Sequence, residues 1–272
     1  MKICSIQDVS CYGQCSLTVA LPVLSACGIE TAILPTAILS THTSGFQGFT
    51  FLDLKDELPR IEEHWKKEGL CFDAVYTGYL GNTQDVEVAL SIAKGSLNKG
   101  PLIIDPAFGD GGKLYPGFDD AYVEGMIEFA RHADVLLPNL TEACALLKRP
   151  YVAKPSKEEV DEILKGLHSL GIKTVILKGI GNTEENTGIV VSDGASVSSY
   201  AHPRIAKDFH GTGDVFASAF VGAYLHGKPA LEAGKIAADF TLECIQNTLD
   251  DPAHAYGVKF EPLLHALYER VM

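Results

Sequence analysis

A glycine-rich turn followed by an acid lies in the C-terminal third of the chain. The segment Gly211-Thr212-Gly213-Asp214 leads into a stretch in which Phe216 and Phe220 have helical spacing. Such a turn exposes main-chain N–H groups, and a helix that begins there adds about half a positive charge. Together they would form an anion hole for a transferring phosphoryl group, and Asp214 could accept a proton from an attacking hydroxyl. An acid is also favoured at any helix N-terminus, so this segment alone leaves both interpretations open.

A second candidate segment runs from Asp105 to Tyr115 and follows the apolar run Leu102–Ile104. In open α/β sheets, ligands bind at the carboxyl ends of strands. Asp105 and Asp110, joined through Pro and Gly, could therefore hold Mg²⁺ near phosphates. Gly and Asp are also common in ordinary exposed turns, which is the alternative.

Two further polar positions follow apolar runs. Asn139 and Glu142 come after Val135–Leu137 and open an expected helix, where Asn139 or Thr141 would serve equally well as a cap. Lys178 ends the run that begins at Thr174, and it could meet nucleotide phosphates or be a solvated surface lysine.

The elements that position these residues alternate along the chain. Short apolar runs, mostly continuous in hydrophobicity, predict parallel strands covered on both faces, and amphipathic stretches between them predict helices. Asp193-Gly194 between two β-prone runs predicts a hairpin. The rhythm predicts a single α/β domain over residues 1–272, with a mostly parallel central sheet flanked by helices and a small β hairpin addition. The expected strands are Lys2–Ile6, Thr31–Ile38, Ala74–Tyr79, Leu102–Ile104, Val135–Leu137 and Thr174–Leu177, the hairpin Gly188–Ser192 and Ser196–Tyr200, and the expected helices Ser16–Cys27, Leu54–Glu68, Thr83–Leu97 and Ser156–Leu170.

Composition excludes several classes of protein. The 272 residues carry a formal net charge of -13, opposite to the balance that a nucleic-acid binder needs. Polar residues interrupt the N-terminal apolar stretch, and no run could span a bilayer, so we expect a cytoplasmic protein. Seven cysteines without a C-x-x-C pair indicate reduced thiols.

Three motifs together resemble those of the ribokinase superfamily. Gly211–Phe220 is similar to its C-terminal signature. Asp105–Tyr115 and Pro138–Ala143 are similar to the D-P-x-x-G-D…Y and P-N-x-x-E-A elements of pyridoxal kinases, a branch of that superfamily. The resemblance implies a ribokinase-like fold, Asp214 as catalytic base, and Gly211, Thr212 and Gly213 as the anion hole. It places Asp110 and Glu142 at the metal. The expected nucleotide-site residues are Asp105, Asp110, Tyr115, Asn139, Glu142, Lys178 and His210, the last within Lys207–His210.

The N-terminal loops resemble the acceptor side of the same branch. Gln7-Asp8-Val9-Ser10 follows the first strand, and Ser40–Phe46 follows the second. Pyridoxal kinases carry Q-S-H-V and S-N-H-T-G-Y there, and T-G-Y where this chain has Thr77-Gly78-Tyr79. The implied walls of a pyridine pocket are Asp8, Ser10, His42, Thr43, Phe46 and Tyr79. Asp8 stands where the animal enzymes have Ser, and an acid there would favour a cationic vitamer such as pyridoxamine.

The resemblance implies an ATP- and Mg²⁺-dependent kinase of a vitamin B6 vitamer, acting on pyridoxal, pyridoxine or pyridoxamine, and leaves open a monovalent cation. A homodimer is the implied assembly, with no nucleic-acid or membrane partner. The nearest alternative is a kinase of hydroxymethylpyrimidine or another small alcohol. Many hydroxymethylpyrimidine kinases carry Cys in G-T-G-C, where this chain has Asp214. An alternative of another class is a non-catalytic nucleotide-binding sensor on the same fold.

Overall fold

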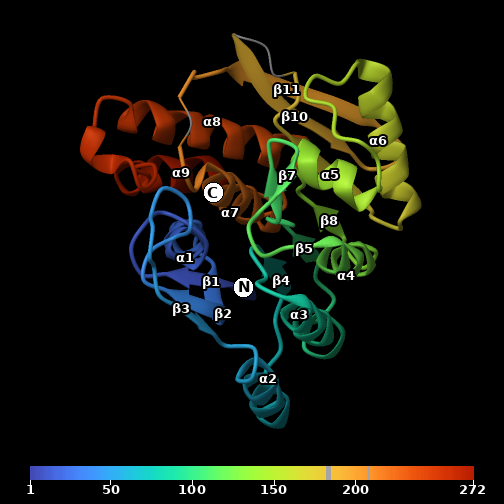
Figure 1. Ribbon diagram of the computed structural model, residues 1–272, viewed down its shortest axis with the longest axis vertical. Coiled ribbons are helices and arrows are strands. Elements are labelled where there is room, and N and C mark those ends of the chain that lie inside the picture. Colours follow the sequence, from blue (N-terminus) through green and yellow to red (C-terminus); the bar gives the residue numbers. More distant parts are fainter. Residues whose placement is uncertain (182–184, 208) are drawn as a thin grey trace.

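The computed structural model describes residues 1–181, 185–207 and 209–272. In this part of the chain the main element is a nine-stranded sheet in the order β11-β10-β9-β8-β5-β4-β1-β2-β3 (Figure 1). Its central strands pair in parallel, and the strands at both ends pair antiparallel with their neighbours. The parallel strands are β1 (Lys2–Ser10), β2 (Glu30–Leu39), β4 (Ala74–Thr77), β5 (Leu102–Ile104), β8 (Val135–Leu136) and β9 (Thr174–Lys178). The antiparallel ones are β3 (Phe51–Asp53), β10 (Asn186–Ser192) and β11 (Val197–Pro203).

Helices cover both faces of the sheet, so the fold has three layers (Figure 1). One face packs against α1 (Leu17–Ala26), α7 (Thr212–Leu225), α8 (Ala230–Thr248) and α9 (Leu264–Val271). The other face packs against α2 (Leu58–Lys67), α3 (Thr83–Gly95), α4 (Asp120–Ala130), α5 (Leu140–Leu146) and α6 (Lys157–Ser169). Short 3₁₀ turns, η1 (Pro252–His254) and η2 (Glu261–Leu263), lie between α8 and α9.

The central strands contribute to two separate hydrophobic cores. Successive side chains of a strand point to opposite faces, and Ile3 and Tyr76 pack on the α7 side while Cys4 and Val75 pack on the α3 side. A strand that is buried on both faces needs apolar residues at every position. This requirement explains the continuous apolar runs, and the predicted parallel sheet and its fold class are confirmed.

The predicted hairpin is also confirmed, because β10 and β11 pair antiparallel around Asp193-Gly194. Gly194 has φ +85°, a conformation that favours glycine. Three short strands were not predicted: β3, and the pair β6 (Gly109–Asp110) and β7 (Lys113–Leu114). They have two or three residues each, too few for any hydrophobic period to show.

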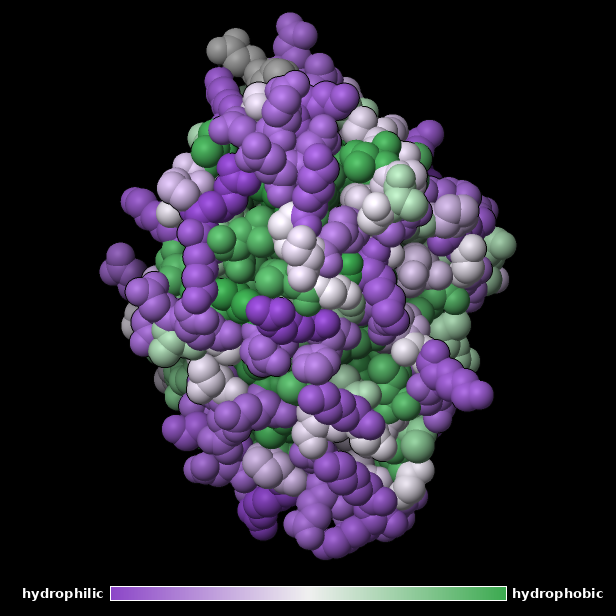
Figure 2. Space-filling model, turned by 90° about the vertical axis from the view of Figure 1, so that its right-hand side faces the viewer, coloured by the Kyte–Doolittle hydropathy of each residue, from purple (hydrophilic) through white to green (hydrophobic). Residues whose placement is uncertain are grey.

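The side of the molecule that carries α4, α5 and α6 is covered mostly by hydrophilic residues, with hydrophobic ones in patches between them (Figure 2). Among the helices that the structure describes, none has the length and apolarity needed to cross a membrane.

Candidate active site

The base predicted from the sequence lies in the first turn of α7. Gly211 is the N-cap of this helix, with φ +74°, and no side chain among the described residues caps the helix there. A Cβ atom on Gly211 would lie 1.6 Å from the carbonyl oxygen of Gln14, so only glycine fits between α7 and the N-terminal loop. The first N–H groups of a helix have no partner within the helix, so they are suited to an anion. The anion hole of Gly211, Thr212 and Gly213 stays a prediction.

The protein environment changes the proton affinity of Asp214. Burial raises its pKa to about 7, with repulsion from Asp105 and Asp8 adding to the rise. A hydrogen bond from the main-chain N–H of Ser16 and the charge of Lys178 act in the opposite direction. A carboxylate with a pKa near neutrality is a far better proton acceptor than an ordinary aspartate, as general base catalysis requires.

A buried ion pair lies beneath the nucleotide side of the site. Lys178 Nζ, at the carboxyl end of β9, is 2.8 Å from Asp105 Oδ1, which follows β5. The two side chains are only 15% and 5% exposed. Burial alone would lower the pKa of Lys178, but Asp105 and Glu142 raise it above its usual value, so the lysine stays charged. Lys178 is therefore part of the site rather than a solvated surface residue, and Asp105 is its partner.

Asn139 and Glu142 form a capping box at the start of α5. Asn139 Oδ1 accepts from the N–H of Glu142 at 3.0 Å, and Glu142 Oε2 accepts from the N–H of Asn139 at 2.8 Å. The same two side chains hold the preceding loop. Glu142 Oε1 accepts from Phe108 N–H at 3.2 Å, and Asn139 Nδ2 donates to the Gly109 carbonyl at 2.7 Å.

That loop continues into the β6–β7 hairpin, which carries Asp110 at its tip. The turn residues Gly111 and Gly112 have φ +57° and +79°, as a two-residue hairpin turn demands. Asp110 is exposed, and its Oδ1 accepts from Gly111 N–H at 2.7 Å. Thr141 fixes the other side of the turn, because its Oγ1 accepts from Gly112 N–H at 2.9 Å.

Tyr115 lies among the four carboxyl groups of this region. Burial raises the pKa of its hydroxyl, and Glu142, Asp110, Asp214 and Asp105 each raise it further. Four acids facing one buried lysine leave an excess of negative charge that a hydrated divalent cation would balance. No three His, Cys, Asp or Glu side chains in the described ranges are arranged to hold a metal directly. Asp110 and Glu142, the residues predicted for the metal, would hold such an ion through its water molecules.

The acceptor side is formed by loops after β1 and β2. Asp8 is 5% exposed, and its Oδ2 accepts from the hydroxyl of Ser10 at 3.1 Å. Burial raises the pKa of Asp8, while hydrogen bonds from Ser16 and Ser10 lower it. The acid predicted to face the acceptor is therefore enclosed next to the base.

His42 is buried and uses both ring nitrogens. Its Nε2 is 2.9 Å from the carbonyl oxygen of Tyr256, which can only accept, so Nε2 carries the proton. Its Nδ1 accepts from Ser44 N–H at 3.2 Å. His42 is thus a neutral side chain that fixes the loop, and its ring contributes a wall together with Phe46, whose ring centre is 5.0 Å away.

Three predicted residues remain. Thr43 is exposed on the loop after β2, and Tyr79, which follows β4, has its ring centre 5.3 Å from that of Phe118. His210 lies 5.2 Å from His42, so the structure places it with the acceptor loops, and its predicted nucleotide contact stays a prediction. Asp208, in the same predicted segment, lies outside the described residues.

Sequence reasoning missed Tyr12 and Tyr256. Their rings lie 4.8 Å apart, and Tyr12 also contacts Phe46 at 5.9 Å. Tyr256 comes from the segment between α8 and α9, far from the other acceptor residues in sequence. Because no motif surrounds it, only its irregular, aromatic context before the last helix could have pointed to it.

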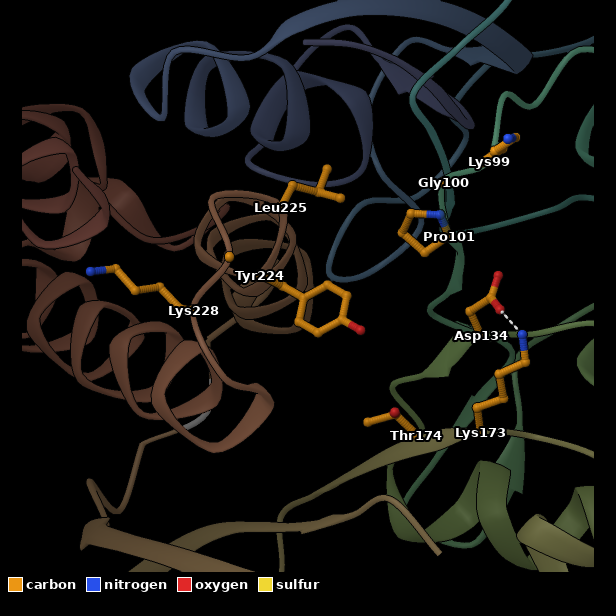
Figure 3. Close-up of a pocket in the computed structure, with 10 residues that line it drawn as sticks. Lys99, Gly100, Pro101, Asp134, Lys173, Thr174, Tyr224, Leu225 and Lys228 are labelled. Atoms are coloured by element: carbon orange, nitrogen blue, oxygen red, sulfur yellow. Dashed lines mark hydrogen bonds and ion pairs between the residues drawn. The ribbon is translucent and has the colours of Figure 1, made fainter.

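A separate pocket of about 550 Å³ lies at the opposite end of the sheet (Figure 3). Its lining comes from the amino ends of β5, β8 and β9 and from the end of α7 at Tyr224. Asp134 and Lys173 pair across its edge at 2.6 Å, while Lys228 points away from it (Figure 3). Along α7, Tyr224 lies ten residues after Asp214, which is about 15 Å at 1.5 Å per residue. This pocket therefore takes no part in the candidate site.

The chain matches the phosphomethylpyrimidine kinase family over residues 20–258. It is 32% identical over 201 residues to a hydroxymethylpyrimidine/phosphomethylpyrimidine kinase of Aquifex aeolicus, covering 72% of this chain and 73% of the relative. It is 29% identical over 263 residues to a pyridoxine/pyridoxal/pyridoxamine kinase of Bordetella pertussis, covering 91% of this chain and 89% of the relative.

Solved structures give the same picture. A provisionally named phosphomethylpyrimidine kinase of Bacteroides thetaiotaomicron, crystallised with pyridoxal, superimposes with a TM-score of 0.93 at 36% identity, over 98% of this chain and 95% of that one. Pyridoxal kinase from Lactobacillus plantarum superimposes with a TM-score of 0.92 at 31% identity, over 98% and 96% of the two chains. The resemblance to ribokinase-type kinases inferred from the motifs is therefore confirmed.

Proposed function

The chain belongs to the phosphomethylpyrimidine kinase family and is a kinase acting on an alcohol group, and from that premise we propose that its acceptor is the 5′-hydroxymethyl group of a vitamin B6 vitamer. The observation that carries the proposal is the contact between the acceptor loops and the start of α7. Gln14 packs on Gly211, and His42 lies 5.2 Å from His210. An alcohol held by those loops lies beside Asp214.

Asp214 would take the proton of the hydroxymethyl group as its oxygen attacks the γ-phosphorus of ATP. The new O–P bond forms while the bond between the γ-phosphorus and the β–γ bridging oxygen breaks, which releases ADP. The N–H groups of Gly211, Thr212 and Gly213 would stabilise the charge that develops on the transferring phosphoryl group. Most of the rate enhancement then comes from positioning and charge stabilisation, as is usual for phosphoryl transfer.

The nucleotide would lie along the carboxyl ends of β5, β8 and β9. Lys178 offers a fixed positive charge there, and Tyr115 offers a hydroxyl that stays protonated. Asp110 and Glu142 are the residues that we propose for Mg²⁺, through its waters. When bound, the ion would neutralise charge on the β- and γ-phosphates.

Aromatic side chains support a planar aromatic acceptor. Tyr12, Phe46 and Tyr256 form one contiguous group, and Tyr79 packs against Phe118. Rings of this kind pack well against the faces or edges of a pyridine. Asp8 adds a negative charge to the pocket, which supports pyridoxamine, with its ammonium group, as the preferred vitamer.

Hydroxymethylpyrimidine is the second candidate acceptor. It is favoured by the family match and by the Aquifex relative, which is named for that activity. It has the same hydroxymethyl group on an aromatic ring, so Asp214 and the anion hole would act on it in the same way. The two acceptors differ in their ring substituents, which the loops around Asp8 and His42 would contact.

The deciding experiment measures ADP release by the purified protein with pyridoxal, pyridoxine, pyridoxamine, hydroxymethylpyrimidine and ribose. We expect the highest kcat/KM with a B6 vitamer. A higher value with hydroxymethylpyrimidine would reverse the order of the two candidates. Turnover with none of the five, together with intact ATP binding, would favour a nucleotide sensor instead.

The role of Asp8 has its own test. Asp8→Ser should lower kcat/KM for pyridoxamine more than for pyridoxal, because it removes the charge that attracts an ammonium group. Thr43→Ala, on the exposed part of the same wall, is the matched control and should leave the ratio of the two values unchanged. An unchanged ratio in Asp8→Ser would remove Asp8 from vitamer selection.

We also propose a homodimer, on the basis of the family resemblance. The edge strand β3 supports it, because Phe51 and Leu52 are 48% and 57% exposed beside Ile38, which is 38% exposed. Exposed apolar edge strands are rarely left uncovered. Sedimentation velocity of the parent protein and of Leu52→Asp, in which dissociation is expected, tests this assignment.

A further inference from the structure

Four aromatic rings form a row between the two sides of the candidate site. Tyr79 follows β4, and its ring centre lies 5.3 Å from that of Phe118. Phe118 in turn stacks on Tyr122, with the ring centres 4.0 Å apart and the ring planes at 19°. The row ends at Phe108, whose ring meets that of Tyr122 at 6.2 Å in a T-shaped arrangement. Aromatic pairs attract one another beyond the area that they bury, so the rings hold one another in place.

One end of the row lies on the acceptor side. The N–H of Gly78, directly before Tyr79, donates to the carbonyl of Ile6 in β1 at 3.2 Å. The carbonyl oxygen of Tyr79 lies 3.5 Å from Oγ1 of Thr36 in β2. The main chain of Tyr79 is therefore held beside β1 and β2, the two strands whose following loops form the acceptor side.

The other end of the row lies on the nucleotide side. Phe108 is fully buried before the β6–β7 hairpin, and its N–H donates to Glu142 Oε1 at 3.2 Å. Its carbonyl accepts from the N–H of Tyr115 at 2.9 Å, and the carbonyl of Tyr115 accepts from the N–H of Phe118 at 3.2 Å. None of these bonds involves Tyr79, so they fix this end of the row without it.

Tyr122 also holds the loop after β4 through a hydrogen bond. Its hydroxyl donates to the carbonyl of Leu80, the residue after Tyr79, at 2.7 Å. Tyr122 is only 3% exposed, and its N–H donates to Asp119 Oδ1, the cap of α4, at 2.9 Å. Tyr122 is thus a buried side chain that is anchored at both ends, and Phe118 lies between its ring and that of Tyr79.

The contact between Phe118 and Tyr122 has an ordinary structural explanation. Phe118 directly precedes the N-cap Asp119, and an apolar residue at that position often packs on the first turns of its helix and fixes how the chain enters it. That explanation does not cover the second contact of Phe118, with the ring of Tyr79. Phe118 is only partly buried, so filling the core does not explain this contact either.

We propose that Phe118 is a positioning residue that, together with Tyr122, holds the ring of Tyr79 at a fixed distance from the nucleotide segment and so aligns the acceptor with the phosphate that it attacks. The proposal rests on the proposed function, because that function makes Tyr79 a wall of the acceptor pocket. Phe118 itself does not touch the reacting atoms. A misplacement of about 1 Å can cost about 10²-fold in rate, so a side chain that sets this distance matters for turnover.

The first test changes the ring of Phe118. Phe118→Leu keeps an apolar side chain but removes the stacked ring, and it should lower kcat/KM for the acceptor by about 10- to 100-fold. Because Glu142 holds the nucleotide segment independently, the Kd of ATP in calorimetry should stay within about twofold. Phe118→Tyr keeps the ring and should have a kcat/KM near that of the parent protein. Parental kcat/KM in Phe118→Leu, an equal loss of ATP affinity, or no recovery in Phe118→Tyr would overturn the proposal.

Trp65→Leu is the matched control for a loss of packing alone. The ring of Trp65 pairs with that of Phe72 at 5.4 Å against the same core, next to the amino end of β4 and so away from the site. Trp65→Leu should unfold at a lower urea concentration than the parent protein and keep its kcat/KM. A loss of kcat/KM as large as in Phe118→Leu would show that any weakening of this core impairs turnover, and the positioning role would be wrong.

A double-mutant cycle with Tyr79→Leu tests the contact itself. If Phe118 acts through Tyr79, Phe118→Leu should change kcat/KM for the acceptor by less than about twofold in the Tyr79→Leu background. A loss as large as in the parent background would refute the coupling. The free energy of unfolding in urea gives the same cycle without catalysis, and additive effects there would also refute it. If the parent protein turned over no acceptor, the proposed function would fail, while the unfolding cycle would still decide whether Phe118 supports Tyr79.

Discussion

Removing Lys178 should expose how strongly the site depends on its buried ion pair. In Lys178→Met the side chain keeps its approximate length, and Asp105 loses a partner 2.8 Å away. At that distance, with an effective dielectric constant of about 20, the attraction is roughly 6 kcal/mol, most of which offsets the cost of burying both charges. Removing one partner leaves the other unpaired and should cost about 3–5 kcal/mol of the free energy of unfolding.

The loss should depend on pH with a defined sign. Burial raises the folded-state pKa of Asp105 above its usual 3.8, and Lys178 opposes that rise. In Lys178→Met the rise is unopposed. A raised folded-state pKa gives stability that is present below the unfolded-state pKa and lost as pH rises through the folded-state pKa. Relative to the parent protein, the variant should therefore be less stable at pH 8 than at pH 5.

Urea unfolding followed by far-UV circular dichroism at pH 5 and pH 8 measures both effects. The double variant Asp105→Asn/Lys178→Met removes both charges and should regain most of the lost stability at pH 8. Lys173→Met is the matched control, because it breaks an ion pair with Asp134 in which the lysine is 75% exposed, and it should change stability little. A loss below about 1 kcal/mol in Lys178→Met, or a double variant as unstable as the single one, would refute the assignment of a buried pair.

Three further predictions concern the base, the anion hole and the nucleotide loop. The kcat/KM of the parent protein should rise with pH through about 7 as Asp214 loses its proton. Asp214→Asn should lower kcat/KM by about 10²- to 10⁴-fold, while calorimetry still detects ATP binding. A flat profile of kcat/KM from pH 5 to pH 9 would contradict the base assignment. Gly211→Ala should lower the free energy of unfolding in urea by more than about 1 kcal/mol and lower kcat by about 10²-fold. The added Cβ would collide with the Gln14 carbonyl and shift the start of α7. A normal kcat would show that the helix start tolerates displacement. Asn139→Ala should lower the free energy of unfolding by about 1 kcal/mol through the lost helix cap. Because the variant also releases the Gly109 carbonyl, it should raise KM for MgATP more than KM for the acceptor. Equal changes in the two KM values would argue against a role specific to the nucleotide side.

The sheet could be predicted from sequence because its strands carry an unambiguous physical requirement. Strands buried on both faces, such as the one through Ile103, must be apolar at every position, and that pattern shows in a single sequence. The strand Phe51–Asp53 could not be predicted, because its residues are exposed and too few to show a period. It forms only because Leu39 and its neighbours in β2 offer a free edge, and this is a tertiary effect.

For the candidate site, too, part could be predicted and part could not. Asp214, Glu142 and His42 could be named as candidates because each sits in a motif at a strand or helix end. Their partners could not. That the proton of His42 lies on Nε2 follows from the Tyr256 carbonyl, and main-chain atoms carry no sequence signature. The positive φ of Ser16, 52°, is equally invisible in the sequence, where a serine before an apolar stretch suggests only an ordinary cap.

The carbonyl of Tyr256 also bears on the order in which the molecule is completed during synthesis. It accepts from Gln14 N–H at 3.3 Å and from His42 at 2.9 Å, so two loops made early are joined by a residue made almost last. A nascent chain that has emerged only as far as β11 contains every strand of the main sheet, but it lacks the base at Asp214 and this link. It also lacks α7, α8 and α9, which cover one face of the sheet, so that face stays bare until the last quarter of the chain is made. The acceptor pocket therefore closes only when the last helices are in place.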